Sequence, residues 1–217
     1  MNRARSAQAK QVRREQILHA AVDLLLDVPY DQVTMAQVAG AAGLAKGTPY
    51  LYWESREELF LSALQAEYGE LLATLTREVP ALPTDPEGLA AALARAVTTR
   101  TRLVTMVGLM HVVLEAHAPA AAVIAFKREM ARGVMGLAAV LHTHLGWLSI
   151  EAAARLLLRL HGAIVSFCQM SSLSDSVREA LAEAPDLALM QVDFERDLRE
   201  LVHDLLIAAR VRGSGHG

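Results

Sequence analysis

The sequence predicts an all-α protein with two domains, and three observations lead to that fold class. Apolar residues recur with the three- and four-residue spacing of helices along most of the 217 residues. The period-two alternation with β-branched residues that is typical of strands is absent from the sequence. Hydrophobic residues make up 53% of the chain and aromatic residues only 5%, so the core must consist chiefly of alanine, leucine, valine and methionine. All of these except valine favour helices.

The domain boundary is placed between residues 1–54 and residues 55–217. A helix is predicted to begin at Ser55 and to run to about Glu78, because apolar residues keep helical spacing over that range. This helix is long enough to leave the first domain and pack against the second, so we expect it to link them. Residues 79–86 contain three prolines and form a clear break after it.

The first helix is predicted from about Arg13 to Asp27, and residues 1–12 are expected to be loose. Several basic residues precede the first acidic one, Glu15, although the whole chain has a net charge of −3. They are Arg3, Arg5, Lys10, Arg13 and Arg14. A basic arm on an acidic body is expected of a protein that touches DNA with one end. The first two arginines are interpreted either as minor-groove contacts or as part of a solvated tail.

Residues 34–59 predict two short helices joined by a tight turn, followed by the start of a third. Thr34 can cap the first helix, and Gly43 can adopt the left-handed conformation that ends it. In the second helix we expect two aromatic side chains to point outward and one inward, namely Tyr50, Tyr52 and Trp53. Two short helices joined in this way form a helix-turn-helix, whose second helix can lie in the major groove of DNA.

The ordered set of residues in and before this region is more specific than any single short motif. It comprises Ile17, Leu18, Ala20, Ala21, Tyr30, Val33, Thr34, Val38, Ala39, Ala42, Gly43, Leu44, Lys46, Gly47, Thr48, Tyr50, Tyr52, Trp53, Ser55, Arg56, Glu57 and Leu59. The set resembles the N-terminal DNA-binding domain of the TetR family of transcriptional regulators and covers about the first quarter of the chain. The resemblance implies a small-molecule pocket in the second domain and a dimer formed by the last two helices of each subunit.

Four residues depart from the pattern of that family. Pro29 stands where a glycine is usual, and Pro49 replaces an apolar residue of the recognition helix. With Thr48 as the cap, Pro49 would occupy the first helical position, so we expect this helix to begin later than in most relatives. Glu54 places a negative charge where phosphates are expected, and Arg56 replaces the usual lysine.

The predicted partner of this domain is a double-stranded DNA operator. Hydroxyl, apolar and amide groups can read base edges, so Gln37, Thr48 and Pro49 are expected to supply sequence specificity. Thr34 and Arg56 are expected to hold backbone phosphates. The full predicted DNA-binding set is Thr34, Gln37, Lys46, Gly47, Thr48, Pro49, Tyr50, Tyr52 and Arg56.

The second domain is predicted to be helical to near its end. The expected helices beyond the linker span residues 86–99, 101–116, 119–145, 150–171 and 193–210. Asp85 and Ser149 can cap two of them. Residues 172–192 are expected to form a loop with one short helix, and residues 211–217 a tail.

Methionines, aromatic residues and histidines in these helices allow two interpretations. They are either ordinary core or the lining of a ligand cavity, because methionine adapts to varied ligands and a histidine can anchor one. The candidates are Met106, Met110, His111, Phe126, Met130, His161, Phe167 and Met170. Few cations lie among them, so an apolar or amphipathic small-molecule effector is expected.

Two apolar stripes on the last two long helices fit the homodimer interface that the resemblance implies, with intramolecular core as the alternative. One stripe comprises Ile150, Ala153, Leu157, Leu160, Ile164 and Phe167; the other comprises Phe194, Leu198, Leu201, Leu205 and Ala208.

Other classes of function fit the sequence less well. No His-Glu-x-x-His motif, glycine-rich phosphate loop or nucleophile elbow occurs, so no enzyme, metal site or cofactor is predicted. The lone Cys168 cannot form a disulfide framework and is interpreted as a small buried hydrophobe. No signal peptide and no apolar run of about 20 residues is apparent, so a cytoplasmic location without membrane contact is expected.

These features predict a regulator, most simply a repressor that binds a palindromic operator as a homodimer and is released by a small molecule. One alternative is a DNA-binding regulator without such an effector, controlled by a protein partner or by its own abundance. Another is a helical enzyme or carrier that retains the fold.

Overall fold

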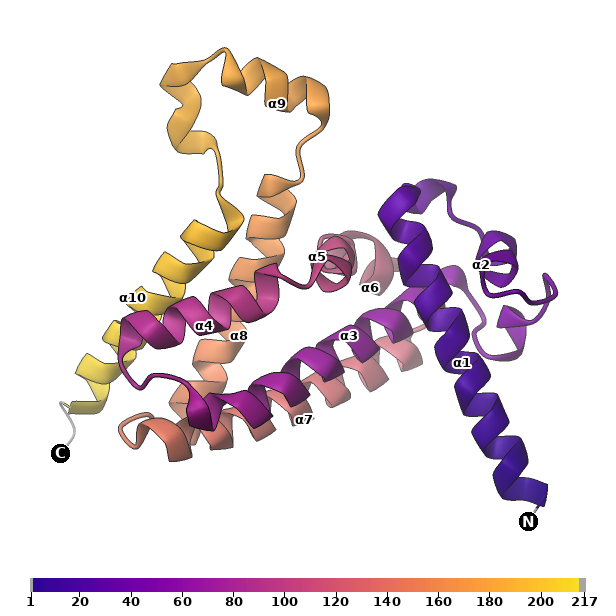
Figure 1. Ribbon diagram of the computed structural model, residues 1–217, viewed down its shortest axis with the longest axis horizontal. Helices are drawn as coiled ribbons and strands as arrows, with labels where there is room; N and C mark the ends of the chain where they lie inside the picture. The colour runs from indigo at the N-terminus through magenta and orange to yellow at the C-terminus, as the bar shows by residue number, and fades with distance from the viewer. Residues whose placement is uncertain (1, 215–217) are drawn as a thin grey trace. The chain divides into compact units, whose positions relative to one another are not determined.

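The computed structural model describes the backbone of residues 2–214 and the side chains of residues 7–110 and 113–212. Within that range the chain forms helices and no strand, which confirms the predicted fold class (Figure 1). The α-helices are α1 (Asn2–Asp27), α2 (Met35–Ala41), α3 (Arg56–Glu78), α4 (Pro86–Thr98), α5 (Thr101–Val107), α6 (Glu115–His117), α7 (Ala120–Leu145), α8 (Ile150–Ser171), α9 (Asp175–Ala182) and α10 (Phe194–Ser214). The 3₁₀ turns are η1 (Tyr30–Gln32), η2 (Pro49–Leu51), η3 (Val79–Ala81) and η5 (Pro185–Met190), and η4 (Met110–Leu114) is π-helical.

The chain forms two compact units. The first contains the described residues up to Tyr68 together with Leu109–Glu129, and the second contains Gly69–Gly108 together with the residues from Met130 onward. Both α3 and α7 run through the boundary, so each helix contributes to both units. The predicted division after residue 54 coincides with the last loop before α3, and it stays a prediction about domains.

The core of the first unit joins α1 to the start of α3. Ile17 of α1, Val38 of α2 and Phe60 of α3 are fully buried, and the ring of Tyr30 meets the ring of Phe60 edge-on at 5.3 Å. An edge-on pair of this kind adds about 0.5–1.5 kcal/mol beyond the burial of its area. This core holds the helix-turn-helix on a rigid support.

The second unit is built on α4, α8 and α10. Helix α10 packs against both α4 and α8, and α5 packs against α8. Leu93 of α4, Ile164 of α8 and Val202 of α10 are among its buried residues. These side chains follow the helical spacing that the sequence shows.

Local signals correctly predicted where α4 and α8 begin. The side chain of Asp85 accepts a hydrogen bond from the backbone of Gly88 at 2.8 Å, and Ser149 accepts one from Ala152 at 3.1 Å. Both predicted caps are therefore present, and α8 has the predicted bounds. The segment predicted as a loop contains the one short helix expected, α9.

Three predictions about helix extent are wrong. Residues 2–12, expected to be loose, continue α1 toward the N-terminus; their alanine and glutamine residues are adequate helix formers. The side chains of Arg3 and Arg5 lie outside the described residues. The expected helix 101–116 is interrupted, because α5 ends at Val107 and a π-helical turn follows. Residues 211–214, expected to be a tail, extend α10.

Residues of both stripes predicted as a dimer seam are buried within the single subunit, more of them on α8 than on α10. Leu157, Leu160 and Ile164 of α8 are buried in the single subunit, as is Leu198 of α10. The core interpretation is therefore correct for these residues. Ile150 remains exposed on α8, while the other stripe members not buried are intermediate, namely Phe167, Phe194, Leu201, Leu205 and Ala208.

Candidate nucleic-acid interface

Helix α2 begins with a capping box formed by Thr34 and Gln37. The Thr34 hydroxyl accepts a hydrogen bond from the Gln37 backbone at 3.2 Å, and the Gln37 side-chain oxygen accepts one from the Thr34 backbone at 2.8 Å. The same hydroxyl donates to that oxygen at 2.8 Å. The Thr34 hydroxyl would have to leave its internal partner to reach a phosphate, whereas the amide NH₂ of Gln37 stays available as a donor.

Gly43 forms the turn that follows α2, as the sequence predicts. Its φ is +69°, a conformation in which a side chain would be strained. The backbone amide of Leu44 donates to the Ala39 carbonyl at 2.8 Å, and that of Gly43 donates to the Gly40 carbonyl at 3.0 Å. These paired bonds form a Schellman motif, which ends the helix sharply and directs the chain into the second helix.

The second helix of the motif is a single 3₁₀ turn, η2. Pro49 occupies its first position as predicted, but Thr48 makes no side-chain cap. Pro49 is buried, so it supports the turn from inside and the prediction that it reads a base is wrong for this conformation. Tyr50 and Leu51 are 59% and 75% exposed, and they form the outer surface of the turn. Leu51 is not among the residues predicted to bind DNA, and its exposure follows from the inward turn of Pro49.

Trp53 has the buried position predicted for it. Its side chain is 2% exposed, and its ring nitrogen donates a hydrogen bond to the Ser62 hydroxyl at 2.9 Å. Glu58 receives a hydrogen bond from Glu54 and donates its backbone amide to Ser55, which fixes the start of α3. Because η2 is a single short turn, it is held in place by its contacts with α3.

Arg56 is part of the scaffold, contrary to the predicted phosphate contact. Its guanidinium donates to the backbone carbonyls of Tyr30 at 3.1 Å and Val33 at 2.8 Å, and to the carboxylate of Glu57 at 3.1 Å. It also lies over the Tyr30 ring, 4.3 Å from the centroid. These contacts use the planar fork of arginine, which the usual lysine could not reproduce.

The Tyr30 and Glu57 side chains complete this network. The Tyr30 hydroxyl donates to Glu57 at 3.0 Å. Burial, followed by the charge of Glu57, raises the pKa of Tyr30 above its usual range. Burial alone would raise the pKa of Glu57, but hydrogen bonds from its backbone, from Tyr30 and from Arg56 outweigh burial and lower it. Both groups therefore keep the protonation states that the hydrogen bond requires.

The basic half of α1 lies beside the second helix of the motif. The Lys10 ammonium lies 5.6 Å from the centroid of the Tyr52 ring, and the Arg14 guanidinium lies 5.3 Å from that of Trp53. Arg13 and Lys46 are exposed. The exposed aromatic and apolar turn is thus flanked by cations, which is the arrangement that a groove contact framed by phosphate contacts requires.

Two family models together match almost the whole described chain. Residues 17–63 match the model for bacterial regulatory proteins of the tetR family, and residues 65–212 match a tetracyclin repressor-like C-terminal domain. The chain belongs to the TetR family. Its members are DNA-binding transcriptional regulators and not enzymes.

Several relatives of this TetR-family protein are known. The chain is 28% identical over 86 residues to the fatty acid metabolism regulator protein of Bacillus subtilis (strain 168), a match that covers 40% of this chain and 44% of that protein. It is 34% identical over 73 residues to an uncharacterized HTH-type transcriptional regulator of Mycobacterium tuberculosis, which covers 34% of this chain and 36% of that protein. Each match spans less than half of the relative's length.

Solved structures show the same TetR-family fold. A TetR transcriptional regulator from Rhodococcus sp. RHA1 has a TM-score of 0.57 and 20% identity, over 91% of this chain and 98% of that one. The fatty acid degradation regulator FadR from Bacillus halodurans has a TM-score of 0.56 and 20% identity, over 89% of this chain and 97% of that one. At these identities the likeness concerns the fold.

The residues predicted to line a ligand cavity occupy different environments in this TetR-family chain. Met106, Met110 and Phe126 are fully buried, and Met170 is 49% exposed. The side chain of His111 lies outside the described residues. The remaining candidates are partly buried, namely Met130, His161 and Phe167. Met110 and Phe126 belong to the first compact unit and the other described candidates to the second, so the cavity stays a prediction.

Other chemistry in the described part of the chain is sparse. Among the described residues, no group of three or more histidine, cysteine or acidic side chains is arranged to hold a metal ion. Burial raises the pKa of Cys168 to about 11, which keeps the thiol protonated at neutral pH and fits its predicted role as a small hydrophobe. No single described helix is long and apolar enough to cross a membrane.

Proposed function

We propose that this protein is a cytoplasmic transcriptional repressor that binds a palindromic operator as a homodimer and is released by an amphipathic small molecule. The observation that carries the proposal is the exposed turn η2, in which Tyr50 and Leu51 are 59% and 75% exposed, with the Lys10 ammonium 5.6 Å from the ring centroid of the adjoining Tyr52. A dimer presents two such turns, and half-sites about 34–36 Å apart follow from one turn of DNA.

Each exposed group has a specific role in this proposal. Leu51 supplies an apolar contact to a thymine methyl group, and Tyr50 contacts a base edge or a phosphate. The free amide NH₂ of Gln37 donates to a base acceptor or a phosphate. Lys46 and the basic residues of α1 contact the phosphate backbone and make binding salt-dependent. Thr48, Gly47 and Tyr52 remain as predicted supporting contacts.

The dimer is proposed to form through the face of α8 and α10 that the single subunit leaves uncovered. Leu158 of α8 is 65% exposed, and Ile207 and Val211 of α10 are 41% and 69% exposed. Gly162 lies on the same side of α8 with no heavy atom within 4 Å of the position that a side chain would occupy. Apolar residues around a glycine allow two helices to approach closely, as a dimer of this family requires.

The names of two relatives suggest the class of effector to test first. The Bacillus subtilis protein is a fatty acid metabolism regulator, and the Bacillus halodurans structure is a fatty acid degradation regulator. A fatty acyl compound is apolar along its chain and polar at one end, which agrees with the apolar and histidine-containing set predicted for the cavity. We therefore propose that a fatty acyl compound acts as the effector.

One observation favours regulation without an effector. Met106, Met110 and Phe126 are fully buried, as expected of a filled core. In that case the protein would be controlled by a partner protein or by its own abundance. The two candidates make opposite predictions about ligand binding in the presence of DNA.

Selection of DNA from a random pool with the purified protein tests the DNA-binding proposal. The expected product is one inverted-repeat sequence, bound more weakly by Tyr50→Ala and Leu51→Ala than by the parent protein. The exposed Glu179→Gln on α9 serves as a matched control because it lies in the other compact unit. Recovery of unrelated, non-palindromic sequences would contradict the proposal.

Calorimetry with and without the selected operator then separates the two modes of regulation. A releasing ligand must bind the free protein more tightly than the DNA complex, by the same factor by which it weakens DNA binding. Couplings of about 1–3 kcal/mol correspond to roughly 5- to 150-fold. Equal affinities for every fatty acyl compound that binds would favour regulation without an effector.

A further inference from the structure

The segment that joins α8 to α10 exposes a set of apolar side chains. It comprises α9, η5 and their connections, and we call residues 173–193 the arm. No residue of the arm is buried. Leu189 is 96% exposed and Met190 65%, while Val177 and Leu187 are 45% and 42% exposed. Figure 1 shows the arm beyond the ends of α8 and α10.

Hydrogen bonds within the arm give it a defined shape. The Arg178 guanidinium donates to the Leu173 carbonyl at 3.0 Å and to the Asp175 carboxylate at 2.6 Å. The Gln191 side chain donates to the Leu181 carbonyl at 3.2 Å and so ties the end of the arm to α9. Apolar side chains that are held in place and left in water mark a surface for contact with another molecule.

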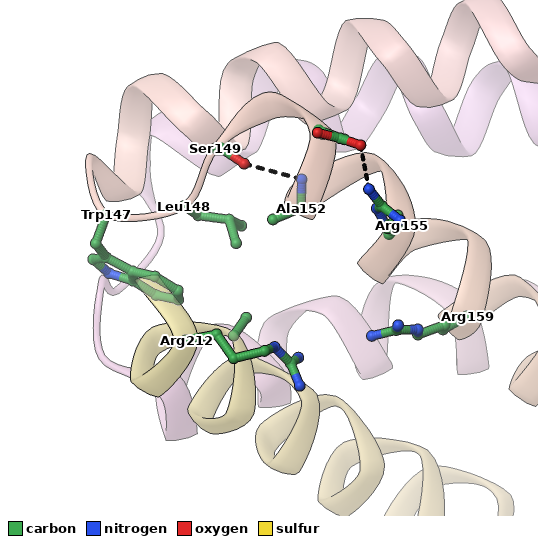
Figure 2. Close-up of a pocket in the computed structure, with 9 residues that line it drawn as sticks. Trp147, Leu148, Ser149, Ala152, Arg155, Arg159 and Arg212 are labelled. Carbon is green, nitrogen blue, oxygen red and sulfur yellow. Dashed lines mark hydrogen bonds and ion pairs between the residues drawn. The ribbon is translucent and has the colours of Figure 1, made fainter. Parts of the chain in front are cut away.

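A hollow of about 570 Å³ lies in the same compact unit, between the start of α8 and the end of α10 (Figure 2). Trp147, Leu148 and Ala152 border it on one side, and Ala209 of α10 borders it on the other. Figure 2 shows the Trp147 indole at its edge. Pockets of about 300–1,000 Å³ accommodate small ligands, so this hollow has room for a few side chains.

The two-fold symmetry of a dimer can bring the arm of one copy to the hollow of the other. This arrangement depends on the proposed function in one respect, namely that two copies meet through the exposed face around Gly162. A two-fold axis that crosses α8 there at right angles makes the two α8 helices antiparallel. At 1.5 Å per residue, the arm then leaves α8 at Ser171, about 14 Å from Gly162. Ala152 of the partner subunit lies about 15 Å from the same point, in the same direction.

The charges of the arm favour the antiparallel arrangement. Glu179, Glu183 and Asp186 form no ion pair among the described residues. A two-fold axis along α8 would make the helices parallel and bring the two arms together, so these carboxylates would repel one another. In the antiparallel arrangement they approach the rim of the hollow, where the exposed Arg159 also has no ion pair in the described part of the chain.

We propose that the arm of each subunit docks in the α8–α10 hollow of its partner. Leu187, Leu189 and Met190 occupy the hollow against Trp147 of the partner subunit, and the carboxylates of the arm lie at the rim near Arg159 of the partner subunit. The contact is isologous, so the dimer contains two such docked arms. It extends the interface beyond the α8–α10 face and is separate from the surface proposed to bind DNA.

Cysteine cross-linking between two versions of the full chain tests this contact. One version carries Leu189→Cys and the other Ala152→Cys, and they are mixed, allowed to exchange subunits and oxidised. We expect a covalent dimer that contains one chain of each version. Ala131→Cys, at an exposed position of α7, replaces Ala152→Cys in the control and should give no such product. The native Cys168 is buried and does not compete.

Sedimentation equilibrium supplies an independent measurement. Leu189→Asp combined with Met190→Asp should weaken the dimer at least 10-fold, because the charges would enter an apolar contact. The circular dichroism spectrum should stay unchanged, since neither side chain is buried in the subunit. Val12→Asp, a similar change at an exposed apolar residue of the other compact unit, should leave the dimer unaffected. Trp147→Ala should weaken the parent dimer but not the arm variant, because both changes remove the same contact.

Failure of arm docking and failure of the proposed dimer give different results. Parental dimer affinity in the arm variant, with no cross-link between copies, would overturn arm docking and leave the dimer standing. A cross-link that forms only within a single chain carrying both cysteines would assign the hollow to the subunit's own arm, which also overturns the proposal. A parent protein that sediments as a monomer at every concentration would overturn the dimer and arm docking together.

Discussion

The helix-turn-helix and the α8–α10 pair differ in which side chains make contacts within the subunit and which remain exposed. In the helix-turn-helix, the fold engages polar groups such as Arg56 and the Thr34 hydroxyl, and an apolar residue, Leu51, stays exposed. In the α8–α10 pair, the fold buries part of the expected apolar stripes, chiefly on α8, and Leu158 and Ile207 stay exposed. In both regions the candidate binding surface consists of residues that the subunit itself does not use.

The largest effect is expected from Leu158→Asp combined with Ile207→Asp. If the exposed face forms the dimer, each subunit brings two carboxylates into an apolar seam, and each buried unpaired charge costs several kcal/mol. We expect a folded monomer with operator binding reduced at least 100-fold, measured by sedimentation and by DNA titration.

Val202→Asp is the matched contrast for this double variant. Val202 is fully buried in the subunit, so the same charge should unfold the chain rather than merely separate two copies. An operator-binding dimer of the double variant would show that the interface lies elsewhere on the chain.

The next largest effect concerns the two arginines Arg56 and Arg13. Removing Arg56 leaves two backbone carbonyls without their donor, so Arg56→Ala should lower the free energy of unfolding by about 2–3 kcal/mol. Arg56→Lys should recover only part of this loss, because a lysine cannot form the same fork of hydrogen bonds.

Arg13→Ala should change DNA binding and leave the stability of the protein unchanged. Arg13 is exposed on α1, so unfolding should be unchanged, while the salt dependence of operator binding should fall by about one phosphate contact per subunit. Urea unfolding and DNA titration at several salt concentrations measure both effects. A loss of stability in Arg13→Ala would contradict the role of Arg13 as a surface residue. Parental stability with weaker DNA binding in Arg56→Ala would contradict the role of Arg56 as part of the scaffold.

The sequence predicted features that depend on near neighbours. The Thr34 cap of α2, the left-handed Gly43 and the caps of α4 and α8 join residues at most five positions apart, and all are present. Trp53 was also assigned correctly to the core. Such features are determined by local hydrogen bonding and by the steric properties of single residues.

The sequence could not predict contacts that depend on distant segments. Arg56 bonds to carbonyls 23 and 26 residues away, and nothing near it in the chain indicates those partners. The burial of Pro49 and the exposure of Leu51 depend in the same way on how η2 packs. The stripes of α8 and α10 had the correct period, but a period does not tell whether the partner helix is α4 or a second subunit.

A smaller effect is expected at the exposed turn. Tyr50→Ala and Leu51→Ala should each weaken operator binding by about 1–2 kcal/mol, as the loss of one groove contact does. Neither should change the free energy of unfolding, because both side chains are more than half exposed. Tyr50→Phe separates the hydroxyl from the ring: parental affinity would indicate a ring contact, and the affinity of the alanine variant would indicate a hydrogen bond.

The smallest effect is a pH dependence of stability that originates at Glu57. Its pKa is lowered in the folded protein from an ordinary value of 4.5, so the folded state favours the carboxylate more than the unfolded chain does. This stabilisation is fully present above the unfolded pKa and is lost as the pH falls through the folded pKa. Glu57→Gln removes it, and it should lower the free energy of unfolding at pH 7 by about 1 kcal/mol.

The difference in the free energy of unfolding between the parent protein and Glu57→Gln should therefore shrink as the pH is lowered below 4.5, the ordinary pKa of a glutamate. Urea unfolding at a fixed protein concentration, at pH 7 and in acid, measures this difference. Glu54→Gln, an exposed change in the same region, controls for the general effect of removing one negative charge. A difference that stayed constant with pH would mean that Glu57 stabilises the start of α3 by packing alone. The hydrogen bond from Tyr30 would then contribute little to holding the turn η2 in place.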